Sequence, residues 1–466
     1  MSILPSSKHQ RTDEQEQIVS AALQYSQHPA IIVRAGAGTG KTFTLYDVAL
    51  ELKPKRTRIL YLVFNKKNRA EAQIKFKGLA SVSTVNGFAF QQMKVGALDR
   101  KVVNDLYPKQ ISQIIGLHTK VCGIHSFAAA KLIKETLRSF CNSADLQVLP
   151  HHMAPSLRRG KNQDLASAVL RYTQSLFDML RPGICSLHPI THDIYTKAFQ
   201  LEGAPGLANF DFVMIDEAQD SSRVTISILR YARSLMMVGD DHQTLYRFRQ
   251  CQNAMQAFDG LNLTLTQSFR FGPDVAELAN AIVYQKRVKP AFAPLKGSSR
   301  IKSTIGRVGP GICHTRLYRS NLEMILDALY FTDKHLPINV IGDLSDLKHK
   351  ISSGWDLYLG NLHSSRKHPL IAPFKAWGDF ERSVHITRDV ELGQIFRIIS
   401  DYTSRVPEII ELLGRDWNAS SARITLVSGH RCKGFEYDNV VIGRDCDKPL
   451  DAARRSGAWG GPLRSN

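Results

Sequence analysis

The 466-residue sequence lacks a long apolar segment. Its longest apolar runs, such as residues 59–64, are far shorter than the roughly 20 residues that span a bilayer. The first residues, MSILPSSKHQRTDEQ, contain no apolar stretch of the kind that forms a signal peptide. We therefore expect a soluble, cytoplasmic protein that works in the compartment where it is made and has no membrane partner.

Cysteine is scarce and scattered. The seven cysteines include no C-x-x-C pair, so the sequence favours neither a zinc site nor a disulfide framework. We expect free thiols in or near packed cores, which is typical of a reducing compartment.

The sequence also lacks internal repeats. No unit of about 20–50 residues repeats, and this excludes solenoids and repeat arrays.

Acidic residues are few relative to basic ones. The sequence has 61 Lys and Arg against 42 Asp and Glu, which gives a net charge of +19. So large an excess of positive charge favours a polyanionic partner, nucleic acid first and an anionic membrane second.

Hydrophobic residues make up 43% of the chain, enough for sizeable cores. At about 100–200 residues per domain, the length predicts two to four domains.

Strand-like and helix-like segments alternate along the chain, which predicts an α/β fold with parallel sheets whose faces are covered. Helices are expected from about residue 41 and at residues 66–76 and 126–140. Strands are expected at residues 31–34, 58–64, 210–215, 235–238, 311–315, 338–341, 424–427 and 439–442.

The changes between α/β segments and mainly helical segments divide the chain into domains. A first α/β domain is expected over residues 1–90 and 188–260, and a second, truncated one over 261–341 and 419–446. Inserted segments are expected at residues 91–187, mainly helical, and at 342–418, and an irregular tail at 447–466.

The segment IIVRAGAGTGKTFTL combines a strand, a loop of small residues and the start of a helix. Glycines in such a loop let backbone N–H groups close around phosphate oxygens at the positive N-terminus of the helix. In this pattern the lysine reaches the β- and γ-phosphates, and the hydroxyl that follows it binds Mg²⁺. The predicted nucleotide-binding residues of the loop are Ala35, Gly36, Ala37, Gly38, Thr39, Gly40, Lys41 and Thr42.

A second segment, FDFVMIDEAQD, ends an apolar run with two adjacent carboxylates. Asp216, at the C-terminal end of a buried strand, suits an Mg²⁺ ligand, either directly or through water, and Glu217 suits polarisation of an attacking water. Because parallel strands bring their carboxyl ends to one edge, this segment and the glycine-rich loop are expected to lie together. The two motifs predict ATP and Mg²⁺ as cofactors.

Three further segments give the sequence a resemblance to a known family. They are MVGDDHQTLYRFR, LTQSFR and ITLVSGHRCKGFEYDNVV, at residues 237–249, 265–270 and 424–441. They resemble signature motifs of superfamily 1 DNA helicases of the UvrD/Rep type, and their spacing is most similar to the F-box DNA helicase branch. The resemblance covers nearly the whole chain to about residue 441. It implies two RecA-like parallel-sheet domains with inserted, mainly helical subdomains, and an ATP-driven motor that moves 3′ to 5′ on single-stranded DNA.

The resemblance also implies roles in ATP hydrolysis. Lys41, Asp216 and Glu217 have the catalytic roles argued above. Gln243 looks like the sensor of the γ-phosphate, which links hydrolysis to the DNA groove. Arg270 looks like an arginine finger, which would stabilise the charge that spreads over the transferred phosphoryl group.

Three residues resemble those that hold the nucleoside. Gln15, in TDEQEQI, looks like the glutamine that reads adenine. Phe269 would lie on the adenine face, and Glu436, in KGFEYD, looks like the ribose contact.

The expected DNA surface combines aromatic rings with polar and basic side chains. Residues 51–77 include nine Lys or Arg and only two Glu, which predicts an electropositive face. The resemblance places base-stacking rings in TLYRFR, and SVSTVNG stands where relatives have a Thr-x-His pair. Core packing is the alternative role for Phe64 and Phe248. The predicted DNA-binding residues are Phe64, Asn65, Thr84, Asn86, Tyr246, Phe248 and His430. The expected partners are single-stranded DNA and its junctions with duplex, and a bacterial protein of this kind would be associated with the nucleoid.

One motif of the family is not found. Relatives end in a segment similar to Y-V-A-x-T-R-A, whose arginine contacts the γ-phosphate. The candidates for it after residue 441 are Arg454, Arg455 and Arg464, which lie in a stretch without the flanking apolar helix. Three functions therefore stay open. The first is a helicase that serves DNA repair or recombination, and the second is a truncated helicase that binds ATP and DNA without unwinding. The third is a P-loop NTPase that does not act on DNA.

Overall fold

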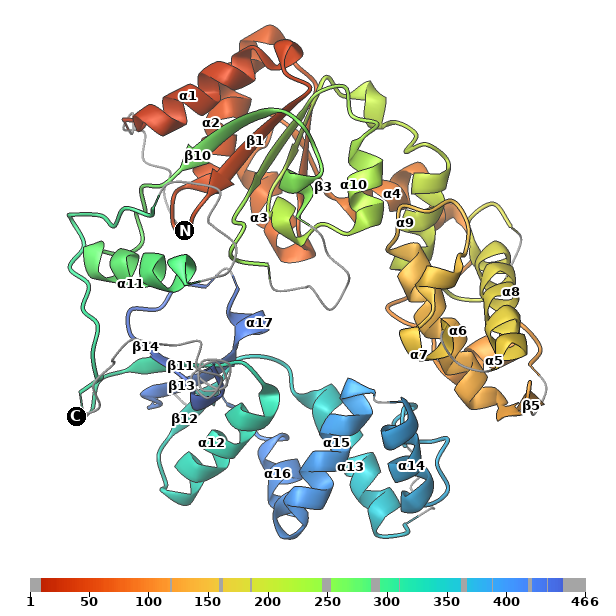
Figure 1. Ribbon diagram of the computed structural model, residues 1–466. Helices are drawn as coiled ribbons and strands as arrows, with labels where there is room; N and C mark the ends of the chain where they lie inside the picture. The colour runs from red at the N-terminus through yellow and green to blue at the C-terminus, as the bar shows by residue number, and fades with distance from the viewer. Residues whose placement is uncertain are drawn as a thin grey trace. The chain divides into compact units, whose positions relative to one another are not determined.

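Two parallel β-sheets organise the protein, whose structure is a computed structural model (Figure 1). The chain divides into two units, Met1–Ile305 and Gly306–Asn466, and each contains one of the sheets. The expected α/β fold class, with parallel sheets and inserted helical segments, is confirmed. The structure describes residues 10–117, 120–158, 162–184, 187–244, 253–285, 294–309, 311–361, 367–387, 389–417, 421–433 and 435–446.

The sheet of the first unit has six strands, and all of its pairings are parallel. In spatial order the strands are β10 (Leu261–Leu265), β1 (Ala30–Ala35), β9 (Leu235–Gly239), β8 (Phe212–Ile215), β2 (Ile59–Val63) and β3 (Ser81–Thr84). The four strands expected at residues 31–34, 58–64, 210–215 and 235–238 are thereby confirmed to within about two residues at each end.

Both faces of this sheet are covered, which explains why its strands are almost continuously apolar. In β1, Ile31 and Val33 pack into one core while Ile32, between them, packs into the other. Helices α1 (Asp13–Leu23), α2 (Lys41–Leu52) and α3 (Lys66–Lys75) line the first face. Helices α4 (Val85–Gln92), α9 (His192–Leu201) and α10 (Arg223–Leu229) line the second, and Figure 1 shows the two groups on opposite sides of the strands.

The strand β10 lies in the first sheet, whereas the sequence pattern placed residues 261–341 in the second α/β domain. It pairs with β1 along its length, and Leu265 at its end is buried in the core that α1 and α2 cover. Helix α11 (Pro273–Tyr284) also belongs to the first unit, and the units divide after Ile305. A strand followed by a helix has the same sequence pattern in either α/β domain. The local pattern therefore did not reveal which sheet the strand joins.

The second unit contains a four-stranded parallel sheet. In spatial order its strands are β12 (Ile338–Val340), β13 (Ile424–Ser428), β11 (His314–Tyr318) and β14 (Val440–Ile442). The strand expected at residues 311–315 begins about three residues later than predicted. Gly311 has a φ of +78°, in the left-handed region that suits a turn and not a strand, and the strand continues to the buried Tyr318.

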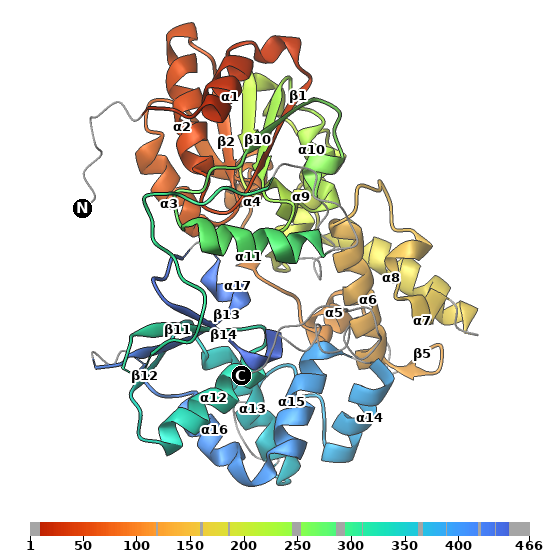
Figure 2. The ribbon, with the colours of Figure 1, turned by 60° about the vertical axis from the view of Figure 1, so that its left-hand side comes forward.

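Helices occupy much of the described chain between the strands of the second unit. Four of them occupy the chain between β12 and β13, and Figure 2 shows them gathered together. They are α13 (Ser345–Tyr358), α14 (Trp377–Thr387), α15 (Val390–Asp401) and α16 (Val406–Leu412). Helix α12 (Asn321–Asp333) follows β11, and α17 (Gly429–Cys432) follows β13.

The first unit carries its own helical insertion between α4 and α9. Its helices are α5 (Pro108–Ile114), α6 (Ser126–Cys141), α7 (Pro155–Arg158) and α8 (Gln163–Leu180). Two short ladders accompany them, β4 (Val102–Val103) with β7 (Ile190–Thr191), and β5 (Lys120–Val121) with β6 (Ile124–His125). Among the helices that the structure describes, none is long and apolar enough to cross a membrane.

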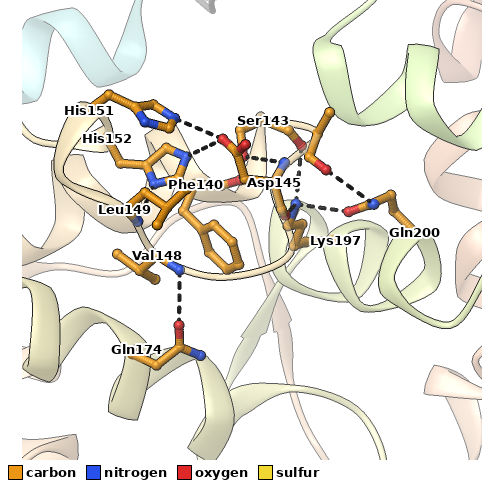
Figure 3. Close-up of polar contacts among 11 residues, drawn as sticks. Phe140, Ser143, Asp145, Val148, Leu149, His151, His152, Gln174, Lys197 and Gln200 are labelled. Atoms are coloured by element: carbon orange, nitrogen blue, oxygen red, sulfur yellow. Dashed lines mark hydrogen bonds and ion pairs between the residues drawn. The ribbon is translucent and has the colours of Figure 1, made fainter.

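A buried lysine joins this insertion to α9 (Figure 3). The ammonium of Lys197 donates to the backbone carbonyls of Ser143 and Asp145 and to Oε1 of Gln200. It also lies 4.6 Å from the centre of the Phe140 ring. Burial lowers the pKa of Lys197 to about 8, so the amine is mainly charged at neutral pH and its carbonyl partners compensate that charge. Lys197 thereby fixes the loop that follows α6.

Asp145 in that loop is held by two histidines. Its Oδ2 contacts Nε2 of His151 at 2.8 Å and Nε2 of His152 at 3.0 Å, as Figure 3 shows. The three side chains have the composition of a metal site, but the tautomer of His152 opposes one. Its Nδ1 accepts the backbone N–H of Leu149 at 2.8 Å, so the neutral ring carries its proton on Nε2 and donates it to Asp145. Hydrogen bonding therefore accounts for this arrangement.

His152 should make the stability of the first unit sensitive to acid. Burial lowers the pKa of His152 below 6.5. The unfolded chain therefore binds the proton more tightly, and the free energy of unfolding falls as the pH drops below 6.5 towards the folded pKa. In His152→Gln the amide oxygen can still accept the Leu149 N–H, as in an ordinary capping box, but it does not titrate.

We expect His152→Gln to match the wild-type Tm at pH 7.5 and to exceed it at pH 5.5. The expected gain is about 1–2 °C, the shift that about 1 kcal/mol produces in a unit of about 300 residues. Thermal unfolding followed by circular dichroism across this pH range measures it. An unchanged dependence of Tm on pH would show that another group controls the acid sensitivity.

Candidate nucleotide-binding site

The glycine-rich loop connects β1 to α2 at the carboxyl edge of the first sheet. Gly38 and Gly40 have φ values of +72° and +81°, a conformation that L side chains rarely adopt. Gly40 is the N-cap of α2, which begins at Lys41, and the Thr39 hydroxyl donates to the Gly36 carbonyl at 2.9 Å. The loop thus turns tightly into a helix N-terminus, where backbone N–H groups and the helix dipole favour a phosphate.

Asp216 follows β8 on the same edge and is the best candidate for a metal ligand. Its Oδ2 accepts the Tyr61 hydroxyl at 3.2 Å, and its Oδ1 accepts the backbone N–H of Glu217 at 2.8 Å. Burial and the neighbouring charge of Glu217 raise the pKa of Asp216 to about 6, while the positive charge of Lys41 opposes the rise. Two adjacent carboxylates at the end of a buried strand fit a divalent cation. The positive charge of the cation would offset the free-energy cost of burying the two negative charges. Thr42, the other predicted Mg²⁺ ligand, lies exposed in the first turn of α2.

The sequence analysis missed a third carboxylate. Asp240 follows β9, the strand that lies between β1 and β8 in the sheet. It is 4% exposed; burial raises its pKa, and the charge of Lys41 opposes that rise. Lys41 therefore acts on the carboxylates that end two neighbouring strands. An acid directly after a predicted strand was the available signal, since the same signal singled out Asp216.

Gln243, the predicted γ-phosphate sensor, is tied to this carboxylate. Its Nε2 donates to Oδ2 of Asp240 at 2.7 Å. A second missed residue, Gln219, lies fully buried beside the pair, with its amide between Glu217 and the backbone of Asp240. Gln219 follows the adjacent acids by two residues, but nothing in its local pattern separates it from a surface glutamine.

The structure brings the predicted arginine finger against the glycine-rich loop. The Phe269 N–H donates to the Gly38 carbonyl at 2.8 Å. A Cβ on Gly38 would lie 2.5 Å from Cβ of Arg270 and 2.7 Å from the Ser268 hydroxyl, so only glycine allows this approach. The ring of Phe269 lies within 4 Å of where a Cβ on Gly40 would be, and the residue is 53% exposed. Such a ring is available to stack on a flat ligand.

Gln15 also lies beside the loop. Its Nε2 is 3.3 Å from where a Cβ on Gly40 would be, and it donates to the Thr44 hydroxyl at 3.4 Å. Its Oε1 accepts the Thr12 N–H at 3.0 Å in the capping box of α1. The amide is therefore engaged with protein groups, and its reading of adenine stays a prediction. The neighbouring Glu14 accepts both the N–H and the hydroxyl of Thr266, at 2.8 and 2.7 Å, and so anchors the segment that carries Arg270.

Several predicted DNA-binding residues follow β2 and β3 on the same edge. Asn65 caps α3 by accepting the Asn68 N–H at 2.8 Å, and Thr84 caps α4 by accepting the Gly87 N–H at 2.9 Å. Phe64, directly after β2, is half-buried. Phe64 and Asn65 therefore follow the strand next to β8, which carries Asp216, and Thr84 ends the strand beyond it. Their contact with DNA stays a prediction.

The remaining candidates fall elsewhere. Asn86 is exposed, and its Oδ1 accepts the Thr196 hydroxyl at 3.0 Å. Tyr246 and Phe248 lie outside the described residues. His430, on α17, and Glu436 are exposed residues of the second unit. Their roles, too, stay predictions.

Comparison with known proteins adds a family to this geometry. A family model described as the UvrD/REP helicase N-terminal domain matches residues 12–259. F-box DNA helicase protein 1 of Schizosaccharomyces pombe is 29% identical over 484 residues, which cover 95% of this chain and 53% of that protein. F-box DNA helicase 1 of Gallus gallus is 28% identical over 466 residues, which cover 93% of this chain and 44% of that protein. An ATP-dependent helicase/nuclease of Limosilactobacillus reuteri is 35% identical over 91 residues, 16% of this chain and 6% of that protein. The chain spans about half the length of the two F-box relatives.

Proposed function

This chain belongs to the UvrD/REP helicase family, and on that premise we propose that it is an ATP-dependent DNA helicase or translocase. One observation carries the proposal. The glycine-rich loop has Asp216 and Asp240 beside it on the sheet edge, and Phe269 and Arg270 packed against it. The finer proposal is 3′ to 5′ movement on single-stranded DNA and its junctions, in the service of DNA repair or recombination.

Each residue around the glycine-rich loop has its own proposed role in ATP hydrolysis. Lys41 would hold the β- and γ-phosphates, and the N-terminus of α2 would bind the phosphate oxygens. Glu217 would orient the attacking water and take up its proton. Arg270 would stabilise the charge on the transferred phosphoryl group. Mg²⁺, held by Thr42 and Asp216, would supply further neutralisation of phosphate charge.

DNA would act on this chemistry through the shared sheet edge. Phe64 and Asn65 follow β2, and Thr84 ends β3, so DNA bound there would contact strand ends in the same rigid sheet as Asp216. The exposed, basic α3 begins directly after Asn65 and would attract the phosphate backbone. Stimulation of ATP hydrolysis by DNA is therefore the property that separates this proposal from a P-loop NTPase of another kind.

We expect single-stranded DNA to raise the rate of ATP hydrolysis by about 10-fold or more, within the range of coupling between distinct sites. The measurement is steady-state phosphate release with and without an oligonucleotide, with Lys41→Ala as the blank. Duplexes with a 3′ or a 5′ single-stranded tail then test the polarity of unwinding. Turnover that ignores DNA would favour an NTPase with another target, and tight DNA binding without turnover would favour a helicase derivative that does not cycle.

A further inference from the structure

A buried tyrosine lies against the predicted metal ligand. Tyr61 is the middle residue of β2, whose sequence is ILYLV, and it is the one side chain of that strand with a polar atom. The residue is 1% exposed, and its hydroxyl donates to Oδ2 of Asp216 at 3.2 Å. The other four residues of the strand show that a hydrocarbon side chain suits this core. The hydroxyl therefore needs an explanation of its own.

The register of the sheet explains why the hydroxyl reaches this carboxylate. Tyr61 pairs with Met214 on the neighbouring β8, and both side chains pack into the core that α1, α2 and α3 cover. Side chains two residues apart on a strand point to the same face, so Asp216 is the next residue after Met214 to face this side. Two residues of a strand span about 6–7 Å, a distance that a tyrosine side chain can bridge. The same strand also fixes the main chain, since the Asp216 N–H donates to the Leu62 carbonyl at 3.1 Å.

The ring of Tyr61 is held by its neighbours. Its centre lies 4.6 Å from the centre of the Phe76 ring, and Phe76 is itself fully buried at the end of α3. The Phe76 ring lies in turn 5.6 Å from the ring of Tyr46 on α2. An ionised carboxylate can only accept, so the hydroxyl is the donor in its bond to Asp216. A fixed ring thus presents a hydrogen-bond donor to the carboxylate.

This hydrogen bond orients the carboxylate and leaves it able to bind a cation. Each oxygen of an ionised carboxylate has two lone pairs. Oδ1 of Asp216 accepts the Glu217 N–H at 2.8 Å and Oδ2 accepts the Tyr61 hydroxyl, so each oxygen retains a lone pair for a cation or for a water bound to it. Mg²⁺ demands nearly ideal octahedral geometry and gives up its waters reluctantly. A carboxylate whose plane is already set therefore binds Mg²⁺ more tightly than one that must be ordered.

We propose that Tyr61 is a positioning residue for Mg²⁺, whose hydroxyl holds the Asp216 carboxylate in the orientation that receives the cation or its bound water. This inference rests on the proposed ATPase function. Tyr61 acts through Asp216 and has no need to touch the nucleotide or the cation. The alternative is that Asp216 merely satisfies a buried hydroxyl. In that case loss of the hydroxyl would leave the affinity for Mg²⁺ unchanged.

The first test is Tyr61→Phe, which keeps the ring and its packing on Phe76 and removes a single oxygen. The Mg²⁺ concentration that gives half-maximal ATP hydrolysis should rise about 10-fold or more, the usual loss when a bond that orients a metal ligand is removed. The kcat at saturating Mg²⁺ should stay near the wild-type value, because excess cation fills the weakened site. An unchanged Mg²⁺ requirement would overturn the proposal.

The matched control is Tyr318→Phe in the second unit. Tyr318 is 2% exposed, and its hydroxyl donates to Oδ2 of Asp327 at 2.6 Å, so the variant removes a bond of the same kind from another buried tyrosine. Its Mg²⁺ requirement should equal that of the wild type, and thermal unfolding checks that both variants are folded. A rise of equal size in Tyr318→Phe would show that the effect is not specific to Tyr61, and the proposal would then be wrong.

The second test measures cation binding without hydrolysis. Mn²⁺ is the probe, because its electron paramagnetic resonance signal falls when it binds, and a non-hydrolysable ATP analogue fills the nucleotide site. Tyr61→Phe should weaken Mn²⁺ binding about 10-fold or more. Titration with a fluorescent nucleotide in the absence of divalent cations should give the wild-type affinity, which separates loss of the cation from loss of the nucleotide. Mn²⁺ binding of wild-type strength in Tyr61→Phe would refute the role of the hydroxyl.

The third test asks whether Tyr61 acts through Asp216. If it does, Tyr61→Phe should add little to the loss of Mn²⁺ affinity caused by Asp216→Asn, because both variants remove the same contribution. Losses that multiply in the double variant would show another route and contradict the proposal. Should Tyr61→Phe fail to fold, Phe76→Leu replaces it in each test, since it loosens the ring without removing the hydroxyl, and Mn²⁺ affinity should again fall.

These measurements distinguish failure of the inference from failure of the proposed function. A wild-type protein that binds Mn²⁺ with the nucleotide analogue but does not hydrolyse ATP refutes the proposed function, and the Mn²⁺ titration still decides the role of Tyr61. A wild-type protein that hydrolyses ATP, together with unchanged cation binding in Tyr61→Phe, refutes the inference alone. A wild-type protein that binds neither cation nor nucleotide refutes both.

Discussion

Lys41→Ala should lower kcat for ATP hydrolysis by about 10²–10³-fold or more, the loss expected when a main electrostatic contact to the reacting phosphates is removed. Lys41 begins α2 directly after the left-handed Gly40, and its charge acts on both Asp216 and Asp240. The side chain is thus placed near both carboxylates, at the end of the loop proposed to bind phosphate. Phosphate release measures the loss in kcat.

Binding of single-stranded DNA should survive in Lys41→Ala, because the predicted DNA-binding residues of the first unit follow other strands. Fluorescence anisotropy with a labelled oligonucleotide measures it. Lys53→Ala is the matched control, since Lys53 is an exposed lysine just beyond the other end of α2. It should keep the wild-type kcat. Turnover at the wild-type rate in Lys41→Ala would refute the assignment of the phosphate loop.

Arg270→Ala should lower kcat by about 10³-fold or more, as expected for an arginine finger. Arg270 packs against Gly38, and the segment that carries it is held there by the Phe269 N–H and by Glu14 on Thr266. Its charge should matter most in the transition state, so nucleotide affinity should fall by less than about 10-fold. Single-turnover hydrolysis and titration with a fluorescent nucleotide separate the two quantities.

Two further variants control the arginine experiment. Arg270→Lys should recover only part of the activity, because an ammonium does not reproduce the planar guanidinium. Arg300→Ala removes an exposed arginine of the same unit and should leave kcat unchanged. If Arg270→Ala loses nucleotide affinity as strongly as kcat, Arg270 serves ground-state binding and not the transition state.

Much of the fold followed from local patterns. The apolar strands and the helices that begin near residues 41, 66 and 126 are confirmed to within about two residues at nearly every end. Apolar runs and helical periodicity are local properties of the sequence. Strands and helices can therefore be predicted without knowing which strand lies next to which. The exception at residues 311–315 arose because Gly311 forms a turn and not a strand.

The family was also legible in the sequence, since its motifs are short, ordered segments, and the match over residues 12–259 confirms the resemblance. The carboxylate Asp240 was missed although it occupies the same position after β9 as Asp216 does after β8. Its importance depends on β9 lying between β1 and β8, which no periodicity reveals.

By itself the sequence determined the elements, the glycine-rich loop and the family, because each depends on residues close together in the chain. The tertiary structure alone decided that β10 joins the first sheet and that Glu14 holds Thr266 across 252 residues. It alone placed the Gln219 amide between Glu217 and Asp240. Strand order and buried hydrogen bonds depend on which distant surfaces pack together, and the free energy of that packing belongs to the whole unit and not to any one segment.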